Sequence, residues 1–262
     1  MFLEVSGLTK HFGGVMAVEH ISFKVKRGEI FALIGPNGAG KTTVFNLLTG
    51  MIPPDEGNAE FKGKSLNGLK PFQIRDLGIA RTFQNLQLFN SLSALENVMV
   101  GAYLDGNKGF IQSLLRLPGV AGEEEQVRQK SLEVLKELGM GKDLHTPAAA
   151  LSFGRKRLLE IARVLAGSPE LLFLDEPASG LNAGESKQLA NYLKKLKEND
   201  FTLVLVEHDM ETVMDVADRI LVLNFGTVIA EGTPEEIQRN AEVKKAYLGE
   251  GDQDEDAGCK WS

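Results

Sequence analysis

Short runs of consecutive apolar residues alternate with helical stretches along much of the chain. The apolar runs lie at residues 30–34, 171–174 and 201–206, and their length and composition are typical of strands buried on both faces. Helices are expected between such runs, among them residues 152–166 and 183–198. The alternation predicts an α/β fold whose sheet is mainly parallel.

The N-terminal part of the chain shows the period of two that marks half-buried strands. Residues 3–5 and 21–25 have this pattern, and we expect them to pair in an antiparallel arrangement. A further strand is expected at residues 59–61, after the turn that Pro53 and Pro54 begin. These strands predict an N-terminal antiparallel β subdomain.

A helical pattern replaces the strand pattern between residues 85 and 150. A short helix is expected after Ser93, and residues 123–138 place several apolar side chains near one helical face. We interpret about residues 85–150 as a helical subdomain inserted between two strands of the core. Its apolar positions serve internal packing or form a groove for a helix of another protein.

The whole chain, residues 1–262, is interpreted as a single domain. Its nucleotide-binding core is expected at about residues 1–84 and 151–240, and about residues 249–262 form an acidic tail that is expected to be disordered.

Composition narrows the class of protein. A net charge of −7 and a pI near 5.3 argue against binding to nucleic acid, since no basic surplus can neutralise phosphates. Cys259 is the only cysteine, so an intrachain disulfide and a cysteine-based zinc site are excluded. We expect neither a signal peptide nor a membrane span, so that any membrane work would need another chain to cross the bilayer.

A glycine-rich loop follows the first apolar run and has the spacing G-x-x-x-x-G-K-[ST]. Glycine allows backbone amides to curl around a pyrophosphate, the following helix adds partial positive charge, and lysine and threonine supply a cation and a metal-ligating hydroxyl. The alternative is a glycine-rich turn that merely precedes a helix. The loop and its helix start comprise Gly35, Pro36, Asn37, Gly38, Ala39, Gly40, Lys41, Thr42 and Thr43.

Acidic residues and a histidine follow two other apolar runs. Asp175 and Glu176 end one strand, and His208 follows the other, which suits a site at the carboxyl edge of an α/β sheet. Asp175 is a candidate ligand of Mg²⁺, Glu176 a candidate base for a water molecule, and His208 a candidate donor to a γ-phosphate oxygen. The alternatives are a solvated turn for the acids and a helix cap for His208.

Three further positions invite a functional interpretation. Phe12 could stack on an adenine base or pack in the core, Gln84 ends a predicted strand, and Ser152 caps a helix whose first turn contains Gly154.

The five motifs stand in a fixed order: the 35–43 loop, Gln84, residues 151–155, Asp175-Glu176 and His208. This order resembles that of the ATP-binding-cassette (ABC) ATPases over about residues 3–232. The resemblance implies a P-loop NTPase core with a mainly parallel sheet, an N-terminal antiparallel β subdomain and an inserted helical subdomain.

The same resemblance implies ATP and Mg²⁺ as cofactors. Phe12 and Val18 would contact the nucleotide together with the loop. Mg²⁺ would be held by Thr42, Gln84 and Asp175, and hydrolysis would depend on Glu176, His208 and Gln84.

Cassettes of this family enclose ATP between two protomers. Ser152 and Gly154 of one protomer would therefore close over the nucleotide held by the other, in a homodimer or in a heterodimer with a paralogous ATPase. The helical subdomain would dock on transmembrane permease subunits, with Gln84 linking it to the metal.

Residues 78–85, 88–89 and 92–101 are similar to the ATPase subunits of bacterial branched-chain amino-acid importers. Three positions depart from the general family: Phe153 stands where glycine is common, Arg155 where glutamine is common, and Asn182 where aspartate is usual. We expect hydrolysis to survive because Ser152 and Gly154 are present.

The resemblance thus implies an ATPase that powers import of branched-chain amino acids. It would be cytoplasmic and peripheral on the inner face of the cell membrane, and a periplasmic or extracellular solute-binding protein would be an indirect partner. Alternatives are an importer of urea, amides or other small solutes, a soluble ABC ATPase acting in translation or DNA repair, and a P-loop kinase.

Overall fold

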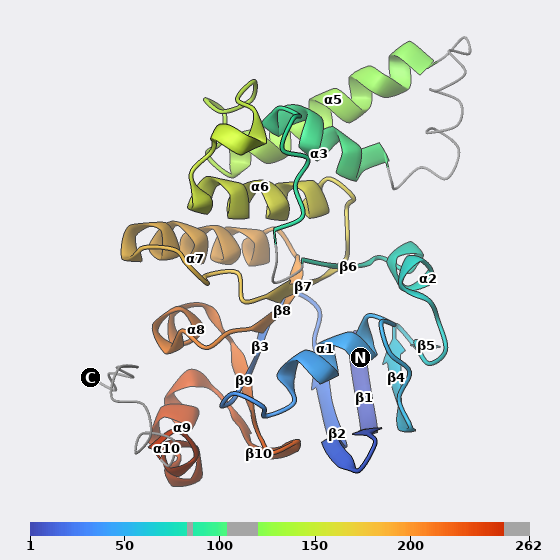
Figure 1. Cartoon of the computed structure of the whole chain (residues 1–262), viewed down its shortest axis with the longest axis vertical. Coiled ribbons are helices and arrows are strands. Elements are labelled where there is room, and N and C mark those ends of the chain that lie inside the picture. Colours follow the sequence, from blue (N-terminus) through green and yellow to red (C-terminus); the bar gives the residue numbers. More distant parts are fainter. Residues whose placement is uncertain (83–85, 104–119, 249–262) are drawn as a thin grey trace.

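The computed structural model describes residues 1–82, 86–103 and 120–248. Figure 1 shows a mixed sheet at the centre, an antiparallel sheet beside it and a helical lobe at one end of the long axis. The predicted fold class, an α/β core with an antiparallel β subdomain and a helical subdomain, is therefore confirmed. Gln84 and the predicted acidic tail lie outside the described residues.

The antiparallel sheet has the strand order β2-β1-β4-β5. Its strands are β1 (Leu3–Phe12), β2 (Val15–Val25), β4 (Glu56–Phe61) and β5 (Lys64–Ser65). β1 and β2 pair as predicted, but both are longer than the patterns at residues 3–5 and 21–25 indicate. The pairing shifts register between Val5 and Leu8 and again before Phe12, and such bulges interrupt the period of two on which the prediction rests.

The central sheet has six strands in the order β10-β9-β3-β8-β7-β6. β3 pairs in parallel with β8 and β9, and β7 pairs in parallel with β8 and β6. Only the β9-β10 hairpin is antiparallel among these pairs. The strands are β3 (Ile30–Ile34), β6 (Ile79–Arg81), β7 (Leu171–Asp175), β8 (Thr202–Val206), β9 (Arg219–Asn224) and β10 (Thr227–Gly232).

Both faces of the central sheet are buried, which explains the uninterrupted apolar runs of the sequence. Phe31 and Leu33 of β3 belong to the hydrophobic cluster that includes Phe45 of helix α1 (Lys41–Leu48). Ile34 belongs to the opposite cluster, which includes side chains of the helices α6 (Phe153–Leu165) and α7 (Ala183–Glu198). The sheet is thus packed on both faces, and this packing fixes the strand ends from which the loops at its edges begin.

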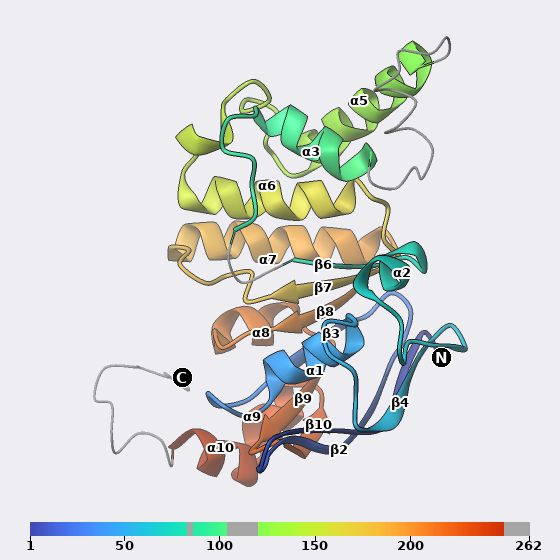
Figure 2. The same cartoon turned by 45° about the vertical axis from the view of Figure 1, so that its right-hand side comes forward.

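The helical lobe consists of α3 (Ala94–Tyr103), α5 (Val120–Glu137) and α6, which pack on one another. Figure 2 shows the same lobe in a second view, with α7 between it and the sheet. None of the helices in the described part of the chain combines the length and apolar character needed to span a bilayer. The remaining helices are α2 (Pro71–Asp76), α8 (Met210–Val216), α9 (Pro234–Arg239), α10 (Ala241–Leu248) and a 3₁₀ turn at Ala148–Ala150.

Gly101 allows α3 and α6 to approach each other closely. A Cβ atom at this position would lie 2.0 Å from the carbonyl oxygen of Arg163 in α6. Gly101→Ala is therefore expected to force the helices apart and to lower the free energy of unfolding by about 1–3 kcal/mol, as measured by urea denaturation.

Gly122→Ala in α5 is the matched control. A Cβ atom there would have no heavy atom within 4 Å, so alanine should leave the stability unchanged or raise it by up to about 1 kcal/mol through its helix propensity. Equal stability of the Gly101→Ala variant and the wild type would contradict a tight contact between α3 and α6.

Candidate active site

Three loops with functional candidates meet at the carboxyl edge of the central sheet. β3 leads into the glycine-rich loop, its neighbour β8 leads to His208, and β7, next to β8, ends at Asp175 and Glu176. The Nδ1 atom of His208 lies 3.9 Å from a carboxylate oxygen of Glu176. The strand order thus brings residues far apart in the sequence to one edge, as expected for an open α/β sheet.

The backbone of the glycine-rich loop approaches other strands too closely for side chains. Gly35 has φ +151°, and a Cβ atom there would lie 2.2 Å from the carbonyl oxygen of Leu223 in β9. Gly40 has φ +98°, and its Cβ would lie 2.6 Å from the Ala17 oxygen and 2.8 Å from a methyl carbon of Val18 in β2. Glycine is therefore required at both positions, and the buried side chain of Val18 lies against the loop at Gly40.

Helix α1 begins at Lys41 without a side-chain cap. Its N-cap is Gly40, and its first turn contains no acidic residue, so the amides of this turn keep their capacity to bind an anion. The Lys41 ammonium donates hydrogen bonds to the carbonyl oxygens of Gly35, at 2.5 Å, and Pro36, at 2.8 Å, which hold it against the loop. Thr42 is exposed and Thr43 is half-buried. Amides, one cation and two hydroxyls together match the chemistry of a triphosphate.

Asp175 ends β7 almost fully buried, and Arg81 of β6 is its ion-pair partner. An Nη atom of Arg81 lies 2.7 Å from Oδ2 of Asp175, while the other Nη donates to Asn46, at 2.6 Å, and Thr49, at 3.1 Å, both near the end of α1. Nothing in the local sequence pattern around Arg81 distinguishes it from a surface arginine, so this residue was not among the predicted site residues.

The residues present fit a magnesium ion that is bound together with a triphosphate. Among the described residues no group of three or more His, Cys, Asp or Glu side chains could hold a metal ion. Mg²⁺ at nucleotide sites needs only one or two protein oxygens, and phosphate oxygens and water complete its octahedron. The Thr42 hydroxyl and the Asp175 carboxylate are oxygen donors of the right kind.

Glu176 has an unusual backbone conformation, with φ +46°. Its N–H donates to the carbonyl oxygen of Val206 in β8, at 2.9 Å, and its carbonyl oxygen accepts from the Ser179 amide and from Arg157 in α6, both at 3.1 Å. The left-handed region is disfavoured for residues with a side chain, and such residues concentrate at functional sites. Glu176 is thus held in place by contacts of its main chain.

Glu207 is a buried acid that was not among the predicted site residues. Its carboxylate accepts hydrogen bonds from the backbone amides of Ala178, at 2.6 Å, and His208, at 3.2 Å. Burial raises the pKa of this carboxyl, although the amide donors oppose the rise. Glu207 therefore joins the loop after Glu176 to the loop that carries His208. Its place directly before the histidine at a strand end was the available signal.

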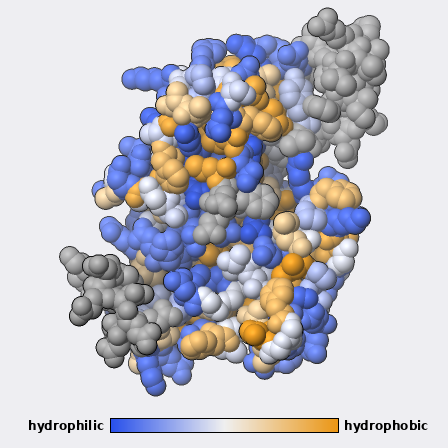
Figure 3. Space-filling model, viewed as in Figure 1, coloured by the Kyte–Doolittle hydropathy of each residue, from blue (hydrophilic) through white to orange (hydrophobic). Residues whose placement is uncertain are grey.

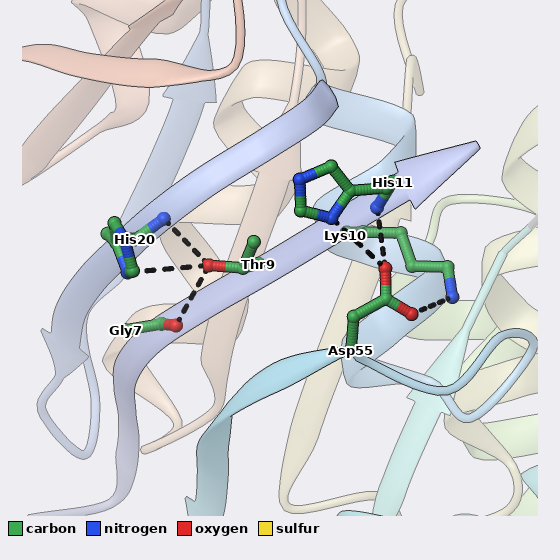
Figure 4. Close-up of polar contacts among 6 residues, drawn as sticks. All are labelled: Gly7, Thr9, Lys10, His11, His20 and Asp55. Atoms are coloured by element: carbon green, nitrogen blue, oxygen red, sulfur yellow. Dashed lines mark hydrogen bonds and ion pairs between the residues drawn. The ribbon is translucent and has the colours of Figure 1, made fainter. Parts of the chain in front are cut away.

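Phe12 lies exposed at the end of the β1-β2 hairpin, so its alternative role as a core residue is wrong. Figure 4 shows how Asp55, in the turn after α1, holds this hairpin: it pairs with Lys10 at 2.7 Å and accepts from the His11 amide at 2.7 Å. The hydrogen bond from Lys10 is the largest cause that lowers the pKa of Asp55. The hairpin that presents Phe12 is thereby tied to the end of the segment that follows the glycine-rich loop.

The Thr9 hydroxyl closes the irregular part of the same hairpin. It accepts from the His20 amide at 3.0 Å and donates to the Gly7 carbonyl at 3.2 Å (Figure 4). These contacts replace ladder hydrogen bonds that the bulge interrupts.

Ser152 caps α6 as predicted, since its hydroxyl accepts from the Arg155 amide at 3.3 Å. The first turn of α6 packs on the segment that follows Glu176. A Cβ on Gly154 would lie 2.4 Å from the Glu185 carboxylate, and one on Gly180 would lie 2.9 Å from the Phe153 ring. In both views α6 lies far from α1 along the long axis (Figures 1 and 2), so Ser152 and Gly154 do not reach the glycine-rich loop of their own chain.

Two departures from the general family have structural roles. Arg155 donates to the Gly139 carbonyl at 3.0 Å and pairs with Asp143 at 3.5 Å, which ties α6 to the loop after α5. Asn182 caps α7 and forms a capping box with Glu185.

Comparison with known proteins agrees with this geometry. The sequence matches the family described as "ABC transporter" over residues 18–179, and that described as "Branched-chain amino acid ATP-binding cassette transporter" over residues 227–253. It is 43% identical to the high-affinity branched-chain amino acid transport ATP-binding protein BraF of Pseudomonas aeruginosa, over 95% of this chain and 98% of that protein.

Solved structures give the same result. The ADP conformation of an ATP-binding cassette of an ABC transporter matches with a TM-score of 0.83 and 31% identity, over 95% of this chain and 98% of that one. A dimeric, post-hydrolysis cassette bound to ADP and phosphate matches with a TM-score of 0.75 and 26% identity, over 89% and 99% of the two chains. With its glycine-rich loop, acidic strand end and histidine at one sheet edge, this chain belongs to the ABC transporter family as an ATP-binding cassette.

Proposed function

We propose that this chain is the ATP-hydrolysing subunit of an importer for branched-chain amino acids. The observation that carries the proposal is the meeting of Lys41, Asp175, Glu176 and His208 at one edge of the central sheet. The similarity to BraF over 95% of the chain supports the branched-chain amino acids as the transported solutes.

The glycine-rich loop would bind the triphosphate of ATP. Amides of the loop and of the first turn of α1 surround the phosphates, Lys41 contacts the β- and γ-phosphate oxygens, and Thr43 lies beside the α-phosphate. Phe12, exposed at its hairpin, stacks on the adenine base. Thr42 and Asp175, with Gln84, would hold Mg²⁺, which when bound neutralises charge on the phosphate oxygens.

Glu176 and His208 would act at the γ-phosphate, where hydrolysis breaks the bond to the β-phosphate. The Glu176 carboxylate orients a water molecule toward the γ-phosphorus and accepts its proton, while His208 donates a hydrogen bond to a γ-phosphate oxygen. Their separation of 3.9 Å supports a shared task, since both must contact groups on the same phosphoryl.

Two cassettes would complete each site. Ser152 and Gly154 lie away from the glycine-rich loop of their own chain, and the N-terminus of α6 offers a second place for an anion. They would therefore close over ATP held by a second copy or a paralogue. The match to a dimeric cassette supports this arrangement.

A groove between α2 and the helical lobe is the proposed docking site for a permease helix. It has a volume of about 1020 Å³, and its lining includes Arg75, Arg81, Phe89 and Arg163. Figure 3 shows the molecule hollowed between these parts, and the half-exposed Phe89 ring offers an apolar contact. The cassette would work in the cytoplasm on the inner face of the membrane, with a periplasmic or extracellular solute-binding protein as an indirect partner.

Glu176→Gln is expected to retain ATP binding and to lower steady-state turnover by at least about a hundredfold, since the amide cannot accept the proton. ATP binding is measured with a fluorescent analogue, turnover by phosphate release, and trapped dimers by gel filtration with ATP. A turnover equal to that of the wild type would exclude Glu176 as the base.

Lys41→Ala is expected to weaken nucleotide binding, because it removes the one full positive charge that the loop itself contributes. The dissociation constant for ATP should rise by about tenfold or more, measured by titration calorimetry. Circular dichroism checks that the fold is kept, and unchanged ATP affinity would overturn the assignment of the loop.

The transported solute is tested in the complete complex. The chain is copurified with its permease subunits, reconstituted in vesicles with the solute-binding protein, and its ATPase rate is measured with leucine, isoleucine, valine, urea or a short amide. Stimulation by the three branched amino acids supports the proposal, whereas stimulation by urea or an amide alone would assign the chain to a related importer.

A further inference from the structure

We propose that Arg157 is a positioning residue for Glu176 of its own chain, which makes the ATPase rate of a site depend on the α6 helix of the same protomer. The inference rests on the proposed role of Glu176 as the base. It concerns a residue that lies outside the motifs from which the function was argued.

Arg157 is buried in the second turn of α6 and has partners on both sides. One Nη lies 3.0 Å from a carboxylate oxygen of Glu160, and the other donates to the carbonyl oxygen of Glu176 at 3.1 Å. The side chains of Arg157 and Glu160 are 2% and 1% exposed. A charged hydrogen bond in so dry a place is strong and directional, because water cannot replace it.

Arg157 contacts the carbonyl oxygen of Glu176, a residue whose backbone conformation is unfavourable. Glu176 has φ +46°, a conformation that a residue with a side chain keeps only where its surroundings hold it. Val206 accepts from its N–H, Ser179 donates to its carbonyl oxygen, and Arg157 donates to that same oxygen from a different helix. A rotation of this peptide would turn the Cα–Cβ bond of Glu176 and move the carboxylate relative to His208.

Helix α6 also presses on the segment that follows Glu176. The Phe153 ring packs where Gly180 lacks a side chain, and Gly154 lies against the Glu185 carboxylate. Contacts at both ends of residues 176–185 therefore come from the first two turns of α6. The placement of α6 decides where this segment, and the base at its start, can lie.

Glu160, the ion-pair partner of Arg157, lies near the segment that follows Gln84. Its carboxylate pairs with Arg157, and burial raises the pKa of this carboxyl while Arg157 and the backbone amide of Gln87 oppose the rise. The ion pair with Glu160 thus holds the guanidinium that donates to the Glu176 carbonyl, and a substitution that leaves either buried charge without its partner is destabilising.

The experiment compares Glu160→Gln with the double variant Arg157→Met/Glu160→Gln. Both variants carry glutamine at position 160, so in neither is a carboxylate left without a cation. They differ at position 157: Glu160→Gln keeps the buried Arg157 cation and its hydrogen bond to the Glu176 carbonyl, whereas the double variant loses both. We expect kcat of the double variant to be at least about tenfold below that of Glu160→Gln, with KM for ATP within about twofold, because the base is misplaced while the nucleotide loop is intact.

Hydrogen exchange gives a readout that does not depend on turnover. The Ser179 amide donates to the same oxygen as Arg157, so its exchange should be faster in the double variant than in Glu160→Gln. Assays are run below both melting temperatures, and ATP binding shows that both variants are folded.

Equal kcat and equal Ser179 exchange in the two variants would overturn the proposal. A rise in KM without a fall in kcat would also overturn it, since that pattern reports lost nucleotide binding. Glu176→Gln separates this outcome from a failure of the proposed function. If that variant hydrolyses ATP normally, Glu176 is not the base. If it is inactive while Glu160→Gln and the double variant match each other, only the positioning role of Arg157 is wrong.

Discussion

The parallel pairing of β3, β8 and β7 is the constraint on which the rest of the site depends. Parallel strands end at the same edge, so the loop before Lys41, the acids after Leu174 and His208 after β8 must lie side by side. Both faces of these strands are buried, and a shift of register would carry apolar side chains out of two packed layers at once. The chemistry is therefore positioned by the core rather than by the loops themselves.

Local sequence pattern predicted the parts of the molecule that obey local rules. The strands buried on both faces, the glycine-rich loop and the cap at Ser152 each follow from a few neighbouring residues, and the structure has them where the sequence indicated. The positions of Asp175, Glu176 and His208 at a common edge followed from the strand ends alone. The length of the β1-β2 hairpin did not, because bulges break its alternation.

The polar contacts that hold the site together could not be read from the sequence. Arg81 reaches Asp175, Glu207 reaches the Ala178 amide, and Arg157 reaches the Glu176 carbonyl across 94, 29 and 19 residues of chain. Nothing in the periodicity around these residues sets them apart from surface charges. Each becomes visible only when strands and helices are packed, since burial is what turns an ordinary charged side chain into a fixed support.

The backbone conformation of Glu176 lowers the stability of the chain at a residue that the proposed activity needs. A left-handed residue with a side chain costs about 1–2 kcal/mol relative to the right-handed region, and glycine would avoid most of that cost. Selection for heat resistance alone would therefore favour glycine or asparagine at position 176 and yield a sturdier cassette without a carboxylate. The protein retains a less stable main chain at this one peptide in exchange for the reach of a glutamate.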